Sequence, residues 1–318
     1  MREIIIGKNE SGQRFDKFLF KYFKKAGSGF IFKMLRKKNI VLNDKKATGK
    51  EIINLDDSVK IYMKDETIDK FRGDSSFKTT SSDIDVVYED DNVLIVNKPA
   101  GVLSQKANED DVSINEMIIS YLLENGSISE EELKTFKPSI CNRLDRNTSG
   151  LVVAGKTLKG LQVMTEVIKN RDVDKYYLTV VDGVLDEGME LNGYLIKDEK
   201  TNRVSISETD NGGDRIETSL EPIDYGKGVT ILEVKLITGK THQIRAHLAS
   251  IGHPIIGDRK YGNDKINKKY PNIKNQLLHA WILKFGDLPE GIEDLSGKRI
   301  MADYPEVFNQ FMDDVEDF

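Results

Sequence analysis

Over residues 1–64, apolar positions follow a helical period twice and a strand-like pattern twice. Between 15 and 23 they recur every three or four residues, which predicts an amphipathic helix with one buried face. Residues 30–36 predict a second, shorter helix. The apolar run at 40–42 and the alternation at 54–63 predict two strands with a polar turn between them. Such a helix, helix, strand, strand unit of about fifty residues is small for an independent core.

The pattern changes after this unit. Residues 65–82 are poor in apolar side chains and rich in Ser and Thr, which predicts a linker. Residues 83–103 predict two strands joined by an acidic turn, and residues 113–126 predict a helix. In that helix Ser113 and Glu116 have the spacing of a capping box.

The remaining sequence predicts mostly strands. A strand at 150–155 precedes a helix at 158–170, and a strand follows at 175–183. Further elements are expected as strands at 203–207, 215–223 and 229–237 and a helix over 240–254. Strands outnumber helices and short turns join most of them. The sequence therefore predicts an α+β fold, a mixed, largely antiparallel sheet with flanking helices.

Length and composition suit a globular protein of two domains. The chain has 318 residues, which we divide into a small basic α+β domain over 1–64, a linker over 65–82 and a larger domain over 83–318. No apolar run approaches the length of a transmembrane helix, and the N-terminus lacks an apolar signal core. The single cysteine, Cys141, excludes an internal disulfide framework and favours a reducing, cytoplasmic location. We expect it to be a semi-buried small residue rather than a nucleophile.

Charge is distributed very unevenly. Residues 1–64 hold 16 Lys and Arg against 7 Asp and Glu, which gives this segment a net charge of +9. The whole chain has a net charge of −6, so residues 65–318 carry −15. Such asymmetry is typical of a polyanion-binding module joined to a differently charged body. A solvated basic surface without a partner is the alternative, and the charge favours binding. Three consecutive cations between the second predicted helix and the first predicted strand form what we call the 36–38 ledge: Arg36, Lys37 and Lys38.

The order and spacing of these N-terminal elements resemble the RNA-binding module named after ribosomal small-subunit protein four. The module's Arg-x-Asp-x-x-Leu pattern at its first helix is met by Arg14, Asp16 and Leu19. The resemblance implies RNA contacts by Arg14, by Lys17 and by the 36–38 ledge.

One stretch matches a nucleotide-binding pattern. Residues 150–157, "GLVVAGKT", fit the phosphate-loop motif G-x-x-x-x-G-K-[ST]. That motif requires a loop whose amides surround phosphate, placed after a buried strand. Here the residues between the glycines are themselves strand-like and polar residues precede them. The sequence therefore argues against a nucleoside triphosphatase.

Metal binding is also disfavoured. Two of the four histidines have zinc-ligand spacing, but the cysteine is distant and the carboxylates are not clustered. Packing or RNA contact is the expected role of these residues: His242, His247, His253 and His279.

Four longer motifs carry a clearer signal. They are "VLIVNKPAGVLS" (93–104), "NRLDRNTSGL" (142–151), "KYYLTVVDG" (175–183) and "LITGKTHQIRAHLASIGHPIIGDRKYG" (236–262). Together and in this order they resemble the motifs of RluA-type RNA pseudouridine synthases, over nearly all of residues 83–285. Two positions depart from the family pattern, since Asn142 replaces a His and Lys240 replaces an Arg.

The resemblance implies that residues 83–318 form a catalytic domain. Asp145 would be the carboxylate that attacks covalently or takes a proton, and Arg245 the guanidinium that orients it. Tyr177 would pack against the uracil and handle protons at the ring. The target uridine must be flipped out of its stack, and Arg143 would fill the vacancy. Because the isomerisation adds and removes no group, neither a redox cofactor nor a metal is implied.

The implied partner is RNA, most directly the large-subunit ribosomal RNA, with transfer RNA as the alternative substrate. The sequence implies no membrane or protein partner. A non-catalytic RNA-binding or ribosome-assembly factor on the same scaffold is the alternative function, which the presence together of Asp145, Tyr177 and Arg245 disfavours.

Overall fold

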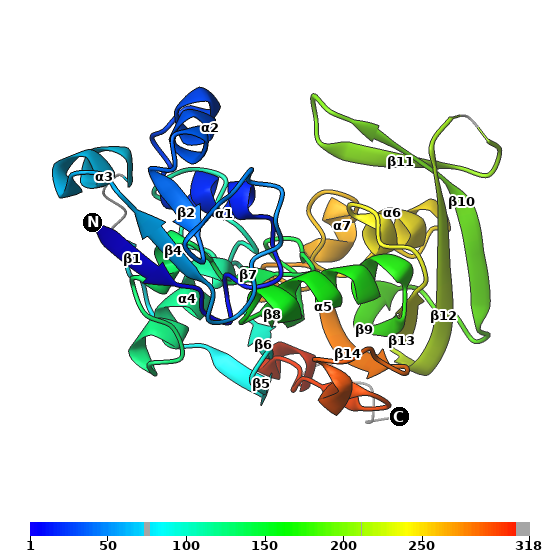
Figure 1. Cartoon of the computed structure of the whole chain (residues 1–318). Helices are drawn as coiled ribbons and strands as arrows, with labels where there is room; N and C mark the ends of the chain where they lie inside the picture. The colour runs from blue at the N-terminus through cyan, green and yellow to red at the C-terminus, as the bar shows by residue number, and fades with distance from the viewer. Residues whose placement is uncertain (73–76, 211, 310–318) are drawn as a thin grey trace.

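Two β-sheets organise the chain in the computed structural model, which describes residues 1–72, 77–210 and 212–309. A four-stranded antiparallel sheet belongs to the N-terminal part, and an eleven-stranded sheet runs through the rest. Figure 1 shows the N-terminal unit beside the larger body, with a long β-hairpin rising on the opposite side.

The N-terminal sheet has the strand order β1-β4-β2-β3. Its unit consists of β1 (Arg2–Ile5), α1 (Phe15–Tyr22), α2 (Ser28–Arg36), β2 (Ile40–Leu42), β3 (Lys45–Lys46), β4 (Ser58–Ile61) and α3 (Asp65–Arg72). The predicted apolar face of α1 is buried, with Phe15, Phe18 and Leu19 inaccessible to solvent. The two helices and both strands that the sequence predicts are therefore confirmed, whereas β1 and β3 were not predicted.

The chain does not leave the N-terminal unit at residue 64, where the sequence predicts a linker. Residues 65–72 form α3, whose Ile68 is fully buried and whose Phe71 packs against the same core. Two apolar residues in a polar stretch give too weak a periodicity to predict a helix, and packing against the unit stabilises it instead. Residues 73–76 of the expected linker lie outside the described residues, and 77–84 form neither helix nor strand.

The large sheet has the order β11-β10-β12-β13-β9-β14-β8-β6-β5, with β15 beside β14 and β7 beside β8. Its strands are β5 (Asp85–Glu89), β6 (Val93–Lys98), β7 (Ser139–Ile140), β8 (Ser149–Gly155), β9 (Val173–Asp182), β10 (Met189–Asp198), β11 (Arg203–Ser207), β12 (Asp214–Gly226), β13 (Val229–Leu236), β14 (Leu278–Phe285) and β15 (Arg299–Met301). Among the pairs formed by described residues, β14 with β8 is parallel and the others are antiparallel. The predicted α+β class and largely antiparallel sheet are confirmed.

Helices flank this sheet. They are α4 (Ile114–Glu124), α5 (Leu158–Asn170), α6 (Gln243–Ser250) and α7 (Asp264–Asn267), with single 3₁₀ turns η1 (Glu132–Lys134) and η2 (Glu293–Leu295). The bounds predicted for α5 are correct, and the Thr157 hydroxyl caps it by accepting from the Gly160 N–H at 3.0 Å. No helix among the residues described is long and apolar enough to cross a membrane.

Strands β6 and β8 pair with each other near the β5 end of the sheet and are buried on both faces. Alternate residues of each enter two hydrophobic clusters, as with Leu94 and Val96 on one face and Val93 and Ile95 on the other. The loop that leads into β8 is therefore anchored at its end by a well-packed strand.

The phosphate-loop interpretation is incompatible with this geometry. Residues 149–155 form β8, and the Leu151–Ala154 backbone pairs with β6 instead of forming a loop. The ammonium of Lys156 lies 2.6 Å from the Glu89 carboxylate and 2.7 Å from the Asp90 carbonyl. Neither the amides nor this lysine is available for a nucleotide phosphate.

Polar contacts join the N-terminal unit to the body. Asn9 donates to the Glu132 carboxylate at 3.3 Å, and the Thr135 hydroxyl lies 2.5 Å from the Glu10 carboxylate. Arg72 pairs with Glu131 close by. These contacts hold the unit against the segment around η1.

Candidate active site

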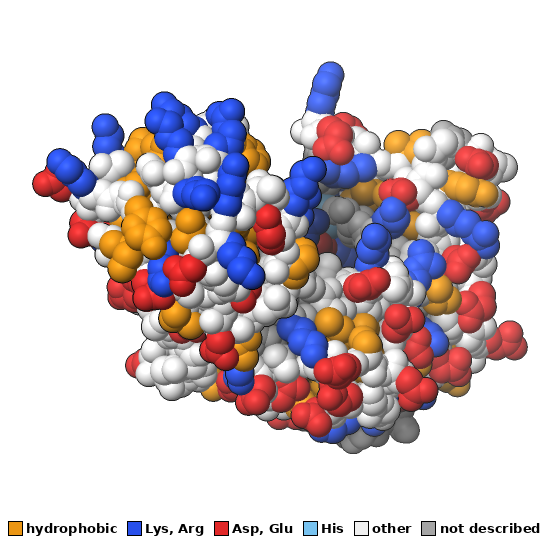
Figure 2. Space-filling view, in the orientation of Figure 1, with side chains coloured by type: hydrophobic (Ala, Val, Ile, Leu, Met, Phe, Trp, Pro, Cys, Tyr) orange, Lys and Arg blue, Asp and Glu red, His pale blue; other side chains and the backbone are white. Residues whose placement is uncertain are grey.

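A cavity of about 710 Å³ opens between the N-terminal unit and the β10–β12 side of the molecule. Figure 2 shows it as a hollow with Lys and Arg side chains on both sides. Its lining comes mainly from the 103–106 segment, the 141–146 loop, the start of β9 and the 239–245 segment that enters α6, with two residues from the β10–β11 hairpin region. Motifs that are distant in the sequence therefore meet here.

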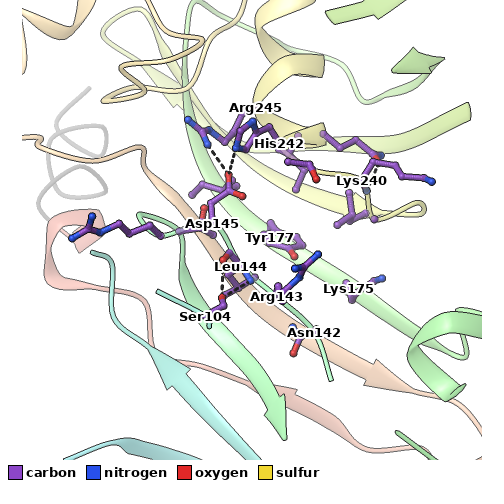
Figure 3. Close-up of a pocket in the computed structure, with 18 of the residues that line it drawn as sticks. Ser104, Asn142, Arg143, Leu144, Asp145, Lys175, Tyr177, Lys240, His242 and Arg245 are labelled. Carbon is purple, nitrogen blue, oxygen red and sulfur yellow. Dashed lines mark hydrogen bonds and ion pairs between the residues drawn. The ribbon is translucent and has the colours of Figure 1, made fainter. Parts of the chain in front are cut away.

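The loop that carries Asp145 is held by the segment that follows β6. Ser104 and Leu144 bond reciprocally, because the Ser104 hydroxyl donates to the Leu144 carbonyl at 2.7 Å and accepts from its N–H at 2.9 Å. Gly101 and Arg146 also bond twice, at 2.9 and 3.0 Å. Because both neighbours of Asp145 are fixed in this way, its carboxylate is presented to the cavity in one position (Figure 3).

Lys98 lies buried beneath this loop and was not among the predicted site residues. Its ammonium donates to the carbonyls of Pro99, Val102 and Arg146 at 3.0, 2.9 and 3.1 Å. Burial lowers its pKa to about 8, although the Asp145 charge acts in the opposite direction. The motif at 93–104 contains this lysine, but its spacing does not indicate which carbonyls it binds.

Lys98→Met is expected to change how stability depends on pH. The Lys98 pKa is about 8 in the folded protein and about 10.4 in an unfolded chain. Between these values the unfolded state binds more protons, so the wild type should gain up to about 3 kcal/mol of unfolding free energy as pH rises. The variant lacks this gain, and urea unfolding of both proteins from about pH 7 to pH 10 measures it. Parallel pH profiles would show that Lys98 does not titrate in this range.

Arg245 connects Asp145 to a second carboxylate. Its Nη1 donates to Asp145 Oδ2 at 2.6 Å, while Nε and Nη2 donate to the two oxygens of Asp258 at 2.7 and 3.0 Å. Arg245 therefore contacts Asp145 through one hydrogen bond, as the expected orienting partner, and forms its bidentate pair with Asp258. Burial alone would lower the pKa of Arg245, but the Asp258 hydrogen bonds and both negative charges raise it overall.

Asp258 is a site residue that the sequence prediction missed. It is fully buried and also accepts hydrogen bonds from the backbone N–H groups of Lys260 and Tyr261, at 2.8 and 3.0 Å. Burial would raise its pKa, but the hydrogen bonds and charge of Arg245 lower it overall. Asp258 lies within the fourth motif, although no spacing rule links it to an arginine 13 residues earlier.

His242 completes the surroundings of Asp145. Its Nε2 lies 3.9 Å from Asp145 Oδ2, and its Nδ1 lies 2.9 Å from the Tyr261 hydroxyl. Burial lowers the pKa of His242 despite the adjacent Asp145 charge. His247, which has zinc-ligand spacing from His242, bonds elsewhere, to the Thr218 hydroxyl at 3.0 Å.

Tyr177 lines the same cavity from β9, in the interior of the sheet. Its side chain is buried, and burial together with the Asp145 charge raises its pKa. The phenol is therefore neutral near pH 7 and offers an uncharged ring face beside Asp145 (Figure 3). Such a surface suits a planar, uncharged base.

Asn142 and Lys240, the two residues that differ from the family motifs, both form hydrogen bonds or ion pairs within the protein. The Asn142 amide donates to the Leu151 carbonyl at 3.1 Å and accepts from the Val153 N–H at 2.8 Å, so it extends the hydrogen bonding of β8. Lys240 pairs with Asp214 at 2.7 Å. Arg143, which follows Asn142 in the chain, is an exposed residue of the cavity lining.

The residues predicted to bind RNA from the N-terminal unit lie outside the cavity lining. Lys17 and the 36–38 ledge are exposed, and Figure 2 shows cations gathered over the α2 side of the unit. Arg14 differs, because its guanidinium forms a bidentate pair with the buried Asp16 at 3.1 and 2.5 Å. That pair limits the freedom of Arg14 to contact a phosphate.

Comparison with known proteins agrees with this architecture. The family described as RNA pseudouridylate synthase matches residues 92–250. The chain is 31% identical over 306 residues to an "Uncharacterized RNA pseudouridine synthase" of Mycoplasma capricolum subsp. capricolum, covering 95% of this chain and 97% of that protein. It is 27% identical over 316 residues to "Ribosomal large subunit pseudouridine synthase D" of Xanthomonas campestris pv. campestris, covering 96% and 89%.

The fold is shared with a solved structure as well. "Human RNA Pseudouridylate Synthase Domain Containing 4" superposes with a TM-score of 0.58 at 19% identity, over 73% of this chain and 93% of that one. The class of protein is thus an isomerase that converts uridine in RNA to pseudouridine. The chain belongs to the RNA pseudouridylate synthase family.

Proposed function

We propose that this enzyme modifies uridines of large-subunit ribosomal RNA and that Asp145 is its reacting group. The carboxylate of Asp145 at the cavity, hydrogen-bonded to a buried arginine at 2.6 Å, is the observation that carries the catalytic assignment. The substrate assignment is supported by relatives named as ribosomal large subunit pseudouridine synthases D and C.

The reaction breaks the glycosidic C–N bond of uridine and rejoins the ring through carbon. Asp145 would either attack covalently or take a proton, and Arg245 would hold it in the required orientation. Tyr177 would pack on the flipped uracil and exclude water, while Arg143 would occupy the space that the base leaves. Each of these four side chains lines the cavity.

We also propose that residues 1–72 act as an RNA-binding unit like that of ribosomal small-subunit protein four, ahead of a catalytic domain over 83–318. Support comes from the separate core of this unit and from the exposed Lys17 and 36–38 ledge. Long-range attraction for RNA then comes mainly from this unit, because the rest of the chain carries net negative charge.

Converting Arg36, Lys37 and Lys38 to Glu should weaken binding to structured RNA. Each lost phosphate contact should reduce the slope of log K against log salt by about 0.7 to 0.9. Turnover of a short stem-loop at saturating concentration should largely persist, because the cavity is unchanged. Titrating the triple variant with RNA at several salt concentrations measures this, and a slope equal to that of the wild type would refute the role of the ledge.

The substrate assignment is tested with unmodified transcripts. Purified enzyme should form pseudouridine in large-subunit ribosomal RNA and leave a transfer RNA mixture unmodified, as measured by tritium release from uridine-labelled RNA. Modification of transfer RNA alone would replace the proposed substrate and leave the catalytic assignment intact.

A further inference from the structure

The cavity is strongly cationic. Seven Lys and Arg side chains line it, with Asp145 as the one lining carboxylate among the described residues. Several of these cations already have partners. Arg245 binds two carboxylates, and Lys197 and Lys240 each pair with an acidic residue, at 2.8 and 2.7 Å. Two others donate to backbone carbonyls: Lys106 and Arg146.

Lys175 has no such partner. Among the described residues, no carboxylate lies within ion-pair distance of its ammonium, since the adjacent Asp174 pairs instead with Lys235 at 3.0 Å. Lys175 is half-buried, in contrast to the exposed Arg143, and burial lowers its pKa. A cation taken out of water without an anion costs free energy, so this arrangement favours an anionic ligand.

Lys175 is placed where it could contact the phosphate of a nucleotide whose base lies on Tyr177. It precedes Tyr177 by two residues on β9, so both side chains lie on the same face of the sheet, roughly 7 Å apart along the strand. A Cβ on Gly239 would lie 3.7 Å from the Lys175 ammonium, which places that ammonium against the loop before α6. A uracil on Tyr177 would have its sugar and phosphate within reach of this ammonium (Figure 3).

We propose that Lys175 binds a phosphodiester next to the target uridine, so that the cavity recognises a nucleotide rather than a base alone. The inference rests on the proposed function of the cavity. It differs from the role of the 36–38 ledge, because this phosphate is bound inside the site. Lys175 would therefore contribute to substrate affinity more than to the chemical step.

Small ligands test this without a known RNA target. Dissociation constants of uridine, uridine 5′-monophosphate and uridine 3′-monophosphate are measured by NMR titration. The wild type should bind one monophosphate about tenfold more tightly than uridine, the effect of one charge-assisted hydrogen bond. Lys175→Met should lose this preference and Lys175→Arg should keep it. Lys235→Met, which removes a nearby cation that already has a carboxylate partner, should also keep it.

Three outcomes would overturn the proposal. The first is a Lys175→Met protein that keeps the phosphate preference, and the second is a Lys235→Met protein that loses it equally. The third is a Lys175→Met protein that binds uridine and both monophosphates more weakly by the same factor, which would indicate contact with the base or sugar. With RNA, Lys175→Met should raise KM about tenfold with little change in kcat. Asp145→Asn should retain the preference for a monophosphate over uridine, because Lys175 is unchanged. If this variant also formed pseudouridine, the catalytic role of Asp145 would be refuted, but the phosphate-binding role of Lys175 would not.

Discussion

Asp145→Asn is expected to reduce pseudouridine formation below detection while RNA binding is retained. Asparagine has nearly the same shape but cannot act as a nucleophile or a base, and no phosphate contact is removed. The Arg245 guanidinium would keep its two bonds to Asp258, so the cavity should keep its form. The measurement is the pseudouridine content of RNA after incubation with each purified protein, alongside an RNA-binding titration.

Lys156→Ala is the matched control. Lys156 is the lysine of the stretch that fits the phosphate-loop pattern, but it lies outside the cavity lining and pairs with Glu89. Activity per folded molecule should therefore stay near that of the wild type, with no requirement for ATP. Full activity in Asp145→Asn, or an absolute ATP requirement in the wild type, would overturn the catalytic assignment.

Arg245→Lys should give activity between those of the wild type and Asp145→Asn. Lysine keeps the charge, but a single ammonium cannot reproduce three hydrogen bonds to Asp145 and Asp258 in fixed directions. We expect kcat to fall about 10- to 100-fold, which corresponds to one lost charge-assisted hydrogen bond. Single-turnover kinetics at saturating enzyme would measure this loss directly.

Asp258→Asn separates the orientation of Arg245 from direct contact with substrate. Asp258 lies behind Arg245, outside the cavity lining, so the KM for RNA should change little while kcat falls. Removing one partner of a buried ion pair should also lower the free energy of unfolding by about 3–5 kcal/mol. A folded Asp258→Asn protein with unchanged kcat would show that Arg245 does not depend on this carboxylate for its position.

The sequence by itself was sufficient for the fold class, for most elements and for the family. Helical periodicity and short continuous apolar runs are local signals, which is why α5 and the strands β6 and β8 were predicted correctly. The family motifs also contain Asp145, Tyr177 and Arg245, and the structure places all three around one cavity. Their catalytic roles stay predictions that the variants above test.

Tertiary structure decided which charged groups pair. The bond between Arg245 and Asp145 spans 100 residues, and no spacing indicates that Asp258 would take the other two guanidinium nitrogens. The same holds for Lys98, whose three carbonyl partners come from two loops, and for α3, which needs the N-terminal core to bury Ile68. Periodicity reports which face of a segment is apolar, but a partner distant in the sequence is chosen only when the sheet brings the loops together.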